Sequence, residues 1–533
     1  VPVKDYSGAS VQTFVSLTAR QDRVRDESEI DASLDLFWKP DSSKQLSLTI
    51  NPDFGHVDSD NLVVNFSPTE TFFSENRAFF TENQSLFTLN GPENLRLVHT
   101  RRIGAKPDVG DAVGADINGA LKFTSVNDDV SYGVFAAMED GDDVASGRDF
   151  YTGRVMHKTD EYNLGYLVTF TERPDINRDA FVQAIDYGYF INKDTRLNGQ
   201  VIHSRLSQND IDANDSATWF TFGHQFAENW EQSLTASYYG DEFEINDLGF
   251  LPRNDLFSLS YSNLYKNHAF AKARLFQEHQ MELSLSHKEN TDGLKLNSSI
   301  TYRDGWSLKD SRYVQWQLTY EDKAHDDLIT RGNNVLNTDR GYELDLFYRG
   351  DTSGKLRYHH HVTLYDRTVN GKGSMLHTHP SYYFSDNYVL TLGLWYTKAE
   401  DWLIWQGGNQ INGYKRSEFT TNLNFNATID DKQELNFRFQ WVALSAKGRQ
   451  TYDVDADGEL VADRENPRDF SVSDTAVQVR YRYEIAPLSN IYVVYSRGGR
   501  ATLDDDESLS DLFSPGWDKR DGDNLSFKIR YQF

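Results

Sequence analysis

The stretch Asn524–Phe533, NLSFKIRYQF, decides the fold because it alternates strictly between apolar and polar side chains. Successive side chains of a β-strand point to opposite faces, so apolar residues at every second position predict a strand with one apolar face. The apolar positions are Leu525, Phe527, Ile529, Tyr531 and Phe533. Three of these five residues are aromatic, so the predicted strand carries an aromatic face up to its last residue.

The same alternation repeats along the chain. It is clear at 476–485 (AVQVRYRYEI), 355–366 (KLRYHHHVTLYD) and 387–396 (NYVLTLGLWY). Short turn-forming runs such as KDT, AEN, SDN and IDDK separate these stretches. Helical spacing is nearly absent, and no run of about 18 apolar residues exists that would cross a membrane as a helix. The chain is therefore predicted to be all-β.

The composition narrows the class of protein. The 81 acidic residues outnumber the 54 basic ones, and the formal charge of −27 argues against binding nucleic acid, whose phosphates need a basic surface. The absence of cysteine excludes disulfides and zinc–thiolate sites. Only 38% of the residues are hydrophobic, yet 14% are aromatic. Half-apolar strands rich in aromatic residues are typical of a membrane barrel, whose polar face lines the lumen.

The last strand favours a membrane barrel over the alternative, a soluble sandwich or propeller. It resembles the assembly signal that ends Gram-negative outer-membrane barrels, and the signal residues are Phe527, Ile529, Tyr531 and Phe533. Connections counted back from Phe533 alternate between long and short. We therefore predict a transmembrane antiparallel β-barrel of about 26 strands, within a range of roughly 22–28, with both termini periplasmic and long extracellular loops. This architecture places the protein in the bacterial outer membrane.

The strand count includes two weak candidates, at 62–66 (LVVNF) and Leu95–Gly104. It treats residues 1–533 as a single barrel and places the connection between the two candidates, 67–93, on the periplasmic side. Periplasmic turns are usually short, so a connection of this length is an exception that needs an explanation.

The connection contains a block that does not alternate, 67–87, SPTETFFSENRAFFTENQSLF. Ser67 and Pro68 fit a helix start, and one short helix would bury most of the phenylalanines. We interpret 67–93 as a periplasmic-side or inward-folded aromatic-acidic segment that narrows the pore or docks a partner. The alternative is a structural belt packed under the barrel rim. The residues expected to carry the gating or docking role are Glu70, Phe72, Phe73, Glu75, Arg77, Phe79, Phe80 and Glu82.

Residues 51–87 resemble the signature of a large, uncharacterised family of outer-membrane β-barrels. That signature reads approximately N-P-D-F-x-x-V-E-x-D, then N-L-x-x-x-E-x-F-F-P-E-K-R-x-F-F-x-E, and here Ser74 and Asn76 replace the usual proline and lysine. The stretches 246–255 (NDLGFLPRND) and 480–498 also resemble the family. The resemblance implies an outer-membrane barrel and no established reaction.

Members of that family usually carry a carbohydrate-binding-family-9-like domain before the barrel, and this sequence has no counterpart of it. The chain also opens VPVKDYSGAS, without the pattern of a signal peptide. We therefore expect a shortened relative, or the barrel that remains after an N-terminal segment is removed.

Two constellations suggest metal ligands. In 451–466, Asp453, Asp455 and Asp457 precede Gly458 and resemble the first half of a calcium loop, although Arg464 stands where the closing glutamate is expected. The alternative is a solvated acidic hairpin.

Four histidines form the second constellation. His359 and His361 share the polar face of one predicted strand, and His377 and His379 share that of the next. A hairpin would bring the pairs opposite each other, where imidazoles on a pore wall would bind a transition metal or sense pH. The alternative is histidines that only hydrogen-bond along the lumen.

The predicted function is a transport or secretion conduit for a polymer or polypeptide, with glycan as one candidate cargo. A structural sheath around a partner such as an electron-transfer cytochrome and an outer-membrane hydrolase are alternatives. No Gly-x-Ser-x-Gly, P-loop or zincin motif occurs, so an enzyme is not expected. No cofactor other than calcium is suggested. Expected partners are outer-membrane lipid and lipopolysaccharide, the barrel-assembly machinery, and a periplasmic or lumenal protein such as a cleaved N-terminal domain.

Overall fold

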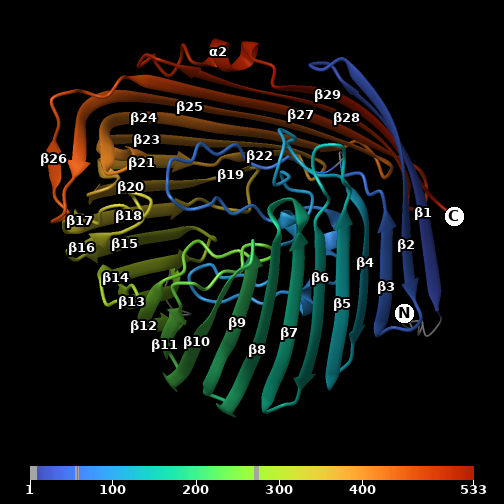
Figure 1. Cartoon of the computed structure of the whole chain (residues 1–533), viewed down its shortest axis with the longest axis horizontal. Helices are drawn as coiled ribbons and strands as arrows, with labels where there is room; N and C mark the ends of the chain where they lie inside the picture. Colours follow the sequence, from blue (N-terminus) through green and yellow to red (C-terminus); the bar gives the residue numbers. More distant parts are fainter. Residues whose placement is uncertain (1–8, 55–56, 58, 269–274) are drawn as a thin grey trace.

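The computed structural model describes residues 9–54, 57, 59–268 and 275–533. Within these residues, 24 antiparallel strands form a closed β-barrel (Figure 1). The barrel closes because β1 (Ser10–Asp22) pairs both with β2 (Glu27–Lys39) and with the last strand, β29 (Gly522–Gln532). The predicted all-β barrel is confirmed, and the number of strands lies within the expected range.

The remaining barrel strands each pair with the next in chain order. They are β3 (Lys44–Ile50), β4 (Ile117–Val126), β5 (Val130–Glu139), β6 (Asp149–Lys158), β7 (Tyr162–Arg173), β8 (Arg178–Asn192), β9 (Thr195–Gln208), β10 (Ile211–Ala227), β11 (Trp230–Tyr239), β12 (Leu256–Asn267), β13 (Phe276–Glu289), β14 (Lys295–Leu308), β15 (Tyr313–Glu321), β18 (Gly341–Arg349), β20 (His359–Arg367), β21 (Gly371–Thr378), β23 (Tyr388–Gly407), β24 (Gln410–Thr428), β25 (Gln433–Val454), β27 (Phe470–Ala486) and β28 (Ser489–Leu503).

Short strands and helices lie in the connections between the barrel strands. β19 (Leu356–Arg357) pairs with β22 (Ser381–Ser385), β26 (Leu460–Ala462) folds back on β25, and β16 (Ala324–Asp326) pairs with β17 (Leu336–Thr338). The helices are α1 (Ala78–Thr81) and α2 (Phe513–Asp518), with the 3-10 turns η1 (Gln84–Leu86), η2 (Thr100–Arg102) and η3 (Pro174–Ile176). In the described part of the chain, no helix has the length and apolar character needed to cross a membrane.

The two faces of the barrel wall differ as the alternation predicts. On β5, the outward side chains Val130, Tyr132, Val134 and Met138 are exposed apolar groups, whereas the intervening Phe135 is buried on the inner face. Successive strand residues point to opposite faces, so the same alternation gives every strand one apolar outer face and one inner face.

The two rims of the barrel carry different connections. At one end, which we call the loop rim, the connections include 51–116, 140–148, 240–255, 322–340, 455–469 and 504–521. At the other end, the C-terminal rim where β29 ends and β1 begins, tight turns such as 127–129, 159–161, 193–194 and 487–488 join the strands. The longest connections lie at the loop rim, as predicted, but tight turns such as 209–210 and 408–409 also lie there, so long and short connections do not alternate strictly.

We call residues 51–116 the lumen segment. Its structure differs from the prediction in three ways. The candidates at 62–66 and Leu95–Gly104 are not barrel strands, which accounts for a predicted count of about 26 instead of 24. The connection that holds 67–93 also leaves the barrel at the loop rim and not at the C-terminal rim. Ile50 at the end of β3 pairs with Gly119 of β4, so the lumen segment departs from and returns to adjacent positions. Figure 1 shows its blue coils inside the ring of strands.

Candidate functional site

The lumen segment begins at the place where the barrel closes. The Asp53 carboxylate accepts hydrogen bonds from the Thr18 hydroxyl (2.8 Å) and from Arg20 (3.1 Å), both on β1. Lys528 on β29 donates to the Asp53 carbonyl oxygen at 2.7 Å, and its Nζ lies 3.3 Å from the Asp53 carboxylate. Both ionised side chains are buried, so the first turn of the lumen segment is fixed to the two strands that form the barrel seam.

The lumen segment then follows the neighbouring part of the wall, where β25 and β27, two to three strands from the seam, hold it. The Gln440 amide oxygen accepts the Leu62 backbone N–H at 2.9 Å, and its NH2 group donates to Asn61 at 3.1 Å. Gln478 accepts from the Ser59 N–H and donates to the Val57 carbonyl. Wall amides therefore replace the strand partners that 62–66 would need in a ladder, which explains why the predicted strand is an extended coil.

An aromatic contact continues this attachment. Phe66 packs edge-on against Trp402 of β23, with ring centroids 5.5 Å apart, and against Phe470 of β27 at 5.7 Å. At the loop rim, Arg331 from the 322–340 connection donates to the Phe66 carbonyl. The lumen segment thus follows the inner wall from the seam to β23.

Arg77 organises the centre of the segment. Its guanidinium forms a bidentate pair with Glu75 (2.8 and 2.6 Å) and donates to the carbonyls of Ile103 (2.8 Å) and Thr100 (2.7 Å). The Thr100 hydroxyl also donates to Glu75 at 2.7 Å. Burial by itself raises the pKa of Glu75, but the Arg77 pair and the Thr100 hydrogen bond lower it below its ordinary value. The pair joins two distant parts of the lumen segment that have no strand pairing of their own.

The phenylalanines of the block divide between two attachments. The short helix α1 contains only Phe79 and Phe80, whose buried rings lie against Phe135 on the inner face of β5. Lys122 of β4 donates to the carbonyls of Phe79 (2.6 Å) and Glu82 at the end of this turn. The expected helix start at Ser67 and Pro68 is not present, because residues 67–69 form a bend in which the Asn65 amide accepts the Ser67 N–H and donates to the Thr69 carbonyl, both at 2.8 Å.

Phe72 makes the other attachment, and Phe73 is half-buried in the same extended stretch. The Phe72 ring lies 5.2 Å from Phe250 and 5.0 Å from His99, and the Arg96 guanidinium sits 4.3 Å above it. Glu70 forms a bidentate pair with Arg102 at 2.7 and 2.8 Å. These contacts direct the second half of the segment toward the 240–255 connection.

The 240–255 connection between β11 and β12 folds into the lumen and completes the site. Arg96 and Phe250 exchange two backbone hydrogen bonds (2.9 and 2.8 Å), and His99 N–H donates to the Leu248 carbonyl at 2.7 Å. Arg102 donates to the Gly249 carbonyl at 3.1 Å. The stretches 51–82 and 246–255, which carry the two family-like motifs, therefore meet inside the barrel.

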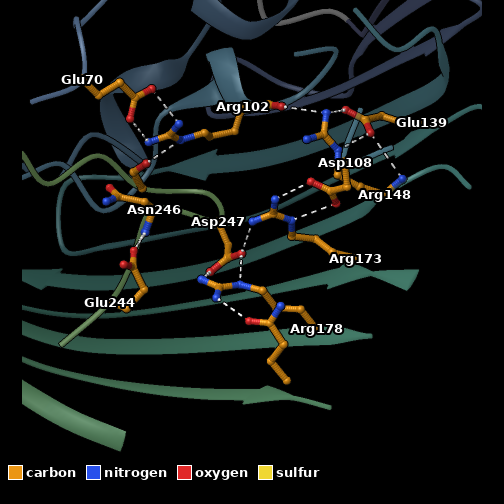
Figure 2. Close-up of polar contacts among 12 residues, drawn as sticks. Glu70, Arg102, Asp108, Glu139, Arg148, Arg173, Arg178, Glu244, Asn246 and Asp247 are labelled. Atoms are coloured by element: carbon orange, nitrogen blue, oxygen red, sulfur yellow. Dashed lines mark hydrogen bonds and ion pairs between the residues drawn. The ribbon is translucent and has the colours of Figure 1, made fainter. Parts of the chain in front are cut away.

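A network of ion pairs holds this connection to the wall (Figure 2). The Asp247 carboxylate accepts three hydrogen bonds, from Arg173 of β7 and twice from Arg178 of β8, all at 2.8 Å. Arg173 also pairs with Asp108 of the lumen segment. Burial raises the pKa of Asp247, but the two guanidinium groups lower it below its ordinary value. Asp247 therefore links the 240–255 connection to β7 and β8 and, through Arg173, to the lumen segment.

A second pair lies beside it. Arg148, the residue before β6, forms a bidentate pair with Glu139 of β5 and donates to the Ala105 carbonyl at 2.9 Å, while Glu139 accepts the Gly104 N–H at 2.7 Å. Sequence reasoning did not identify these wall residues, because each is a single charge on a polar strand face. The motif 246–255 was the one signal that pointed to Asp247.

A cavity of about 860 Å³ lies at the loop rim, between the returning end of the lumen segment and β1, β2, β28 and β29. Its lining includes Arg20, Arg25, Glu29, Val113 and Asp116. The cavity borders β1 and β29, the two strands that form the seam, and shares Arg20 with the Asp53 site.

The four predicted histidines do meet. His361 pairs directly with His377 across β20 and β21, and His379 N–H donates to the His359 carbonyl. The prediction that the two histidine pairs lie opposite each other is confirmed. The ring centroids of His359 and His377 are 5.0 Å apart. Across the residues that the structure describes, no group of three or more His, Asp or Glu side chains is arranged to hold a metal ion. The metal hypothesis therefore gains no support from this arrangement.

The acidic triplet folds as a hairpin turn. Asp455 accepts the N–H groups of Asp457 (3.0 Å) and Glu459 (2.9 Å), and Asp453 lies within β25. This use of the Asp455 carboxylate corresponds to the solvated hairpin alternative, and the calcium prediction likewise gains no support in the described residues.

The predicted insertion-signal residues lie on the outer face of β29, except Phe533, which follows the strand. Phe527 and Tyr531 are each 43% exposed, while the alternating Lys528 points inward to Asp53. The final strand therefore presents aromatic groups outside and anchors the lumen segment inside.

Comparison with known proteins gives one family and several structures of similar form. Residues 10–127 and 163–533 match the family described as Domain of unknown function (DUF5916). No curated protein matches the chain. Among solved structures, the siderophore receptor PirA from Acinetobacter baumannii has 10% identity and a TM-score of 0.47, over 98% of this chain and 80% of that one.

Two further structures are similar at the same level. The siderophore receptor PirA from Pseudomonas aeruginosa has 8% identity and a TM-score of 0.45, over 98% of this chain and 80% of that one. The copper transporter OprC has 10% identity and a TM-score of 0.40, over all of this chain (100%) and 82% of that one.

Proposed function

The chain belongs to the DUF5916 family, whose function is unknown, and we propose that it is a gated transport conduit of the bacterial outer membrane. The lumen segment is the gate, and its motif residues hold it closed against the wall. The observation that carries this proposal is the attachment of residues 51–116 to opposite walls through side chains and not through a continuous sheet.

The outer face supports the membrane location. Exposed apolar side chains recur on the outward positions of strands far apart in the chain, including Leu121, Val134, Val201, Leu318 and Leu364. A water-exposed surface rarely carries so many large apolar groups around its whole circumference, whereas lipid covers them without cost. Long connections face the outside in such barrels, so the loop rim is extracellular and the C-terminal rim periplasmic.

The attachment of the lumen segment supports gating. Each contact between the segment and the β25–β27 wall is a hydrogen bond or ring contact of a side chain, as at Gln440 and Trp402. Such contacts open one by one, whereas a strand within a barrel ladder is locked by its neighbours. A barrel of this size needs something inside it to be closed, and the lumen segment is that element.

The sheath alternative is less favoured. A sheath needs a lumen that is free for its partner, whereas the lumen segment and the 240–255 connection occupy part of this one. Polymer or polypeptide cargo is compatible with the width of a 24-strand barrel.

The test is the conductance of the purified protein in planar bilayers. Asn51 N–H donates to the Asn118 carbonyl at 2.8 Å, so deleting 53–115 and inserting a short glycine linker leaves β3 and β4 joined as a hairpin. We expect the deletion variant to show larger and more frequent conductance steps than the intact chain. Replacing residues 505–518 of the 504–521 connection by a glycine linker of equal length is the matched control, because this connection lies at the same rim and packs on β25 and β28. Equal conductance in the deletion variant and the intact chain would contradict the proposal.

A further inference from the structure

The cavity of about 860 Å³ at the loop rim has the size of a ligand site, and we call it the seam cavity. Sites that hold small molecules enclose roughly 300–1,000 Å³. One side of the seam cavity is formed by β2, β1, β29 and β28, which pair in this order across the barrel seam (Figure 1). The other side is formed by 112–116, the returning end of the lumen segment.

The strand register arranges the wall side of the seam cavity in two rows. Direct cross-strand partners make up each row, Glu29, Arg20, Ser526 and Val494 in one and Glu27, Asp22, Asn524 and Ser496 in the other. Arg20 donates to Asp53 of the lumen segment, so both rows, two residues apart on every strand, face the lumen. Strands lie about 4.8 Å apart, so each row spans roughly 14 Å of the wall.

The exposure of the lining residues shows how deep the seam cavity is. Glu27 and Asp116 are exposed, and Val113 of the lumen segment is 85% exposed. Ser526 and Val494, by contrast, are 8% and 3% exposed. The cavity therefore extends from solvent at the loop rim to buried residues of the wall.

Polar side chains at this wall have unused hydrogen-bonding capacity. Within the part of the chain that the structure describes, the side chains of Ser526, Asn524 and Ser496 make no hydrogen bond. Ser526 is more than nine-tenths buried, and its position on β29 turns it into the seam cavity. Buried hydroxyls in proteins are nearly always hydrogen-bonded, so a molecule in the cavity is expected to complete this group.

Carboxylates dominate the charge around the seam cavity. Five carboxylates, Asp22, Glu27, Glu29, Asp116 and Asp521, line it together with two guanidinium groups, Arg20 and Arg25. Arg20 lies 3.1 Å from Asp53 and 3.9 Å from Glu29, so much of its charge is already matched. Among the described residues, the side chains of Glu27 and Asp116 have neither a hydrogen bond nor an ion pair. A concave site lined mainly by one sign of charge attracts the opposite sign.

The acidic character continues around the loop rim. In the 504–521 connection, whose last residue lines the cavity, the run 504–507 (DDDE) precedes three more aspartates and two basic residues. The formal charge of the whole chain is −27. A cation that approaches the loop rim is therefore attracted, and an anion repelled, before either reaches the seam cavity.

The carboxylates of the seam cavity are spread out and do not converge on one point. Across the residues that the structure describes, no group of three or more His, Asp or Glu side chains is arranged to hold a metal ion. Glu27 and Glu29 lie on β2, whereas Asp116 lies on the opposite side of the cavity. A calcium ion needs its oxygen ligands within about 2.3–2.6 Å, whereas separated carboxylates suit a ligand whose positive charges are spread along a chain.

We propose that the seam cavity binds a chain that carries several primary ammonium groups, which a linear polyamine and a lysine-rich peptide both supply. An ammonium group has three N–H donors, and the carboxylates, serine hydroxyls and asparagine amide of the wall accept them. An extended peptide advances about 3.3–3.6 Å per residue, so a row of roughly 14 Å takes four residues. This inference rests on the proposed conduit function and names its cargo class.

The test is binding to the detergent-solubilised full chain by isothermal titration at low salt. Spermine and tetralysine are the probes, and tetraglutamate is their anionic counterpart. We expect spermine, tetralysine or both to bind, and whichever binds identifies the source of the ammonium groups. The double variant Glu27→Gln/Asp116→Asn is expected to weaken that binding about tenfold, because it removes two carboxylates that have no partner in the protein.

The matched control is the double variant Asp463→Asn/Glu465→Gln. Both residues are exposed in the 455–469 connection at the same rim, away from the lining of the seam cavity. This control changes the net charge of the chain by the same amount, so it separates contacts in the cavity from the general field of the loop rim. It is expected to bind the probes like the intact chain.

Three outcomes would overturn the inference. The first is that neither spermine nor tetralysine binds the intact chain, and the second is that tetraglutamate binds as tightly as they do. The third is that both double variants weaken binding equally while retaining the heat-dependent gel mobility of a folded barrel. Each result leaves the bilayer test of the gate untouched, so failure of the cargo assignment is separable from failure of the conduit.

Discussion

At the scale of single residues, the lumen segment depends on a few buried charges. The side chains of Arg77 and Glu75 are 9% and 5% exposed, and they form an ion pair. Arg77 also donates to the carbonyls of Thr100 and Ile103, and Glu75 accepts from the Thr100 hydroxyl. A buried pair of this kind adds little over an apolar replacement, but removing one partner leaves an unpaired buried charge. The motif residues are therefore needed together.

Arg77→Met is expected to loosen the lumen segment by about 3–5 kcal/mol, because it leaves the Glu75 carboxylate buried without its guanidinium. Hydrogen exchange in detergent micelles measures this, as faster exchange of the amides in 75–103. Lys193→Met is the control, since Lys193 has a side chain that is 90% exposed in a turn at the C-terminal rim. Unchanged exchange in Arg77→Met would show that the pair does not hold the segment.

His99 gives the segment a pH dependence. Burial, followed by the positive charge of Arg102, lowers its pKa from 6.5 to about 4, and the other groups that face it are Glu70, Glu75 and Arg96. A histidine with a lowered folded pKa is neutral when folded and protonates more easily when unfolded. Its contribution is present above pH 6.5 and is lost as the pH falls toward about 4.

Acidification from pH 7 to pH 4 is therefore expected to lower the protection of amides around His99, measured as the exchange rate relative to the intrinsic rate at each pH, and His99→Phe is expected to reduce this change. Phenylalanine keeps the ring contacts with Phe72 and Phe250 but cannot be protonated. His360→Phe, at an exposed position on β20, is the control. If His99→Phe lost the same protection on acidification as the intact chain, the effect would come from carboxylates such as Glu70 and Glu75 and not from His99.

At the scale of elements, tight turns determine which strands become neighbours. Gly371 begins β21 with φ +69°, and a Cβ there would stand 1.6 Å from the Glu400 carbonyl oxygen of β23. Glycine is therefore required both by the backbone conformation and by the approach of the next strand. This turn sets the register that brings His361 opposite His377.

Gly371→Ala is expected to lower the thermal midpoint of the barrel by more than Gly293→Ala. Gly293 has a similar φ of +86°, but a Cβ there would meet no atom within 4 Å, so the substitution carries the backbone strain, about 1 kcal/mol, without the collision. Heat-dependent gel mobility measures both midpoints. Equal shifts would mean that the β20–β21 turn relaxes to accept a side chain.

At the scale of the whole molecule, the seam and the lumen segment share one anchor. Asp53 joins Arg20 on β1 to Lys528 on β29, and those two strands form the pairing that closes the barrel. Closure of the barrel and docking of the lumen segment are thus coupled through one buried carboxylate.

Asp53→Asn is expected to destabilise the closed barrel by about 3–5 kcal/mol, because it removes the buried carboxylate that pairs with Arg20 and Lys528. The measurement is the urea midpoint of unfolding in detergent, followed by gel mobility. Asp143→Asn, an exposed acidic residue in the 140–148 connection, is the control. A midpoint equal to that of the intact chain would show that the seam closes independently of the segment.

The sequence predicted most of the wall because the wall follows a local rule. Alternation identified β20, β23, β27 and β29, and the same rule predicted that His361 and His377 would face each other. It failed at 62–66 and Leu95–Gly104, where alternation also occurs. Leu95, Leu97 and Ile103 are fully buried, so these stretches alternate because one side packs on the inner wall, not because they pair in the ladder.

The sequence by itself determined the all-β barrel, its two unlike rims and the aromatic outer face of its last strand, because these features repeat with period two and need only neighbouring residues. Only the tertiary structure decided that the aromatic-acidic block lies inside and what it touches. Those outcomes depend on pairs such as Asp53 with Lys528 and Asp247 with Arg173, whose members are far apart in the chain. Family-like motifs include Asp53 and Asp247, but no local pattern tells which charge each will pair with, because the partners come together only when the barrel closes and removes them from water.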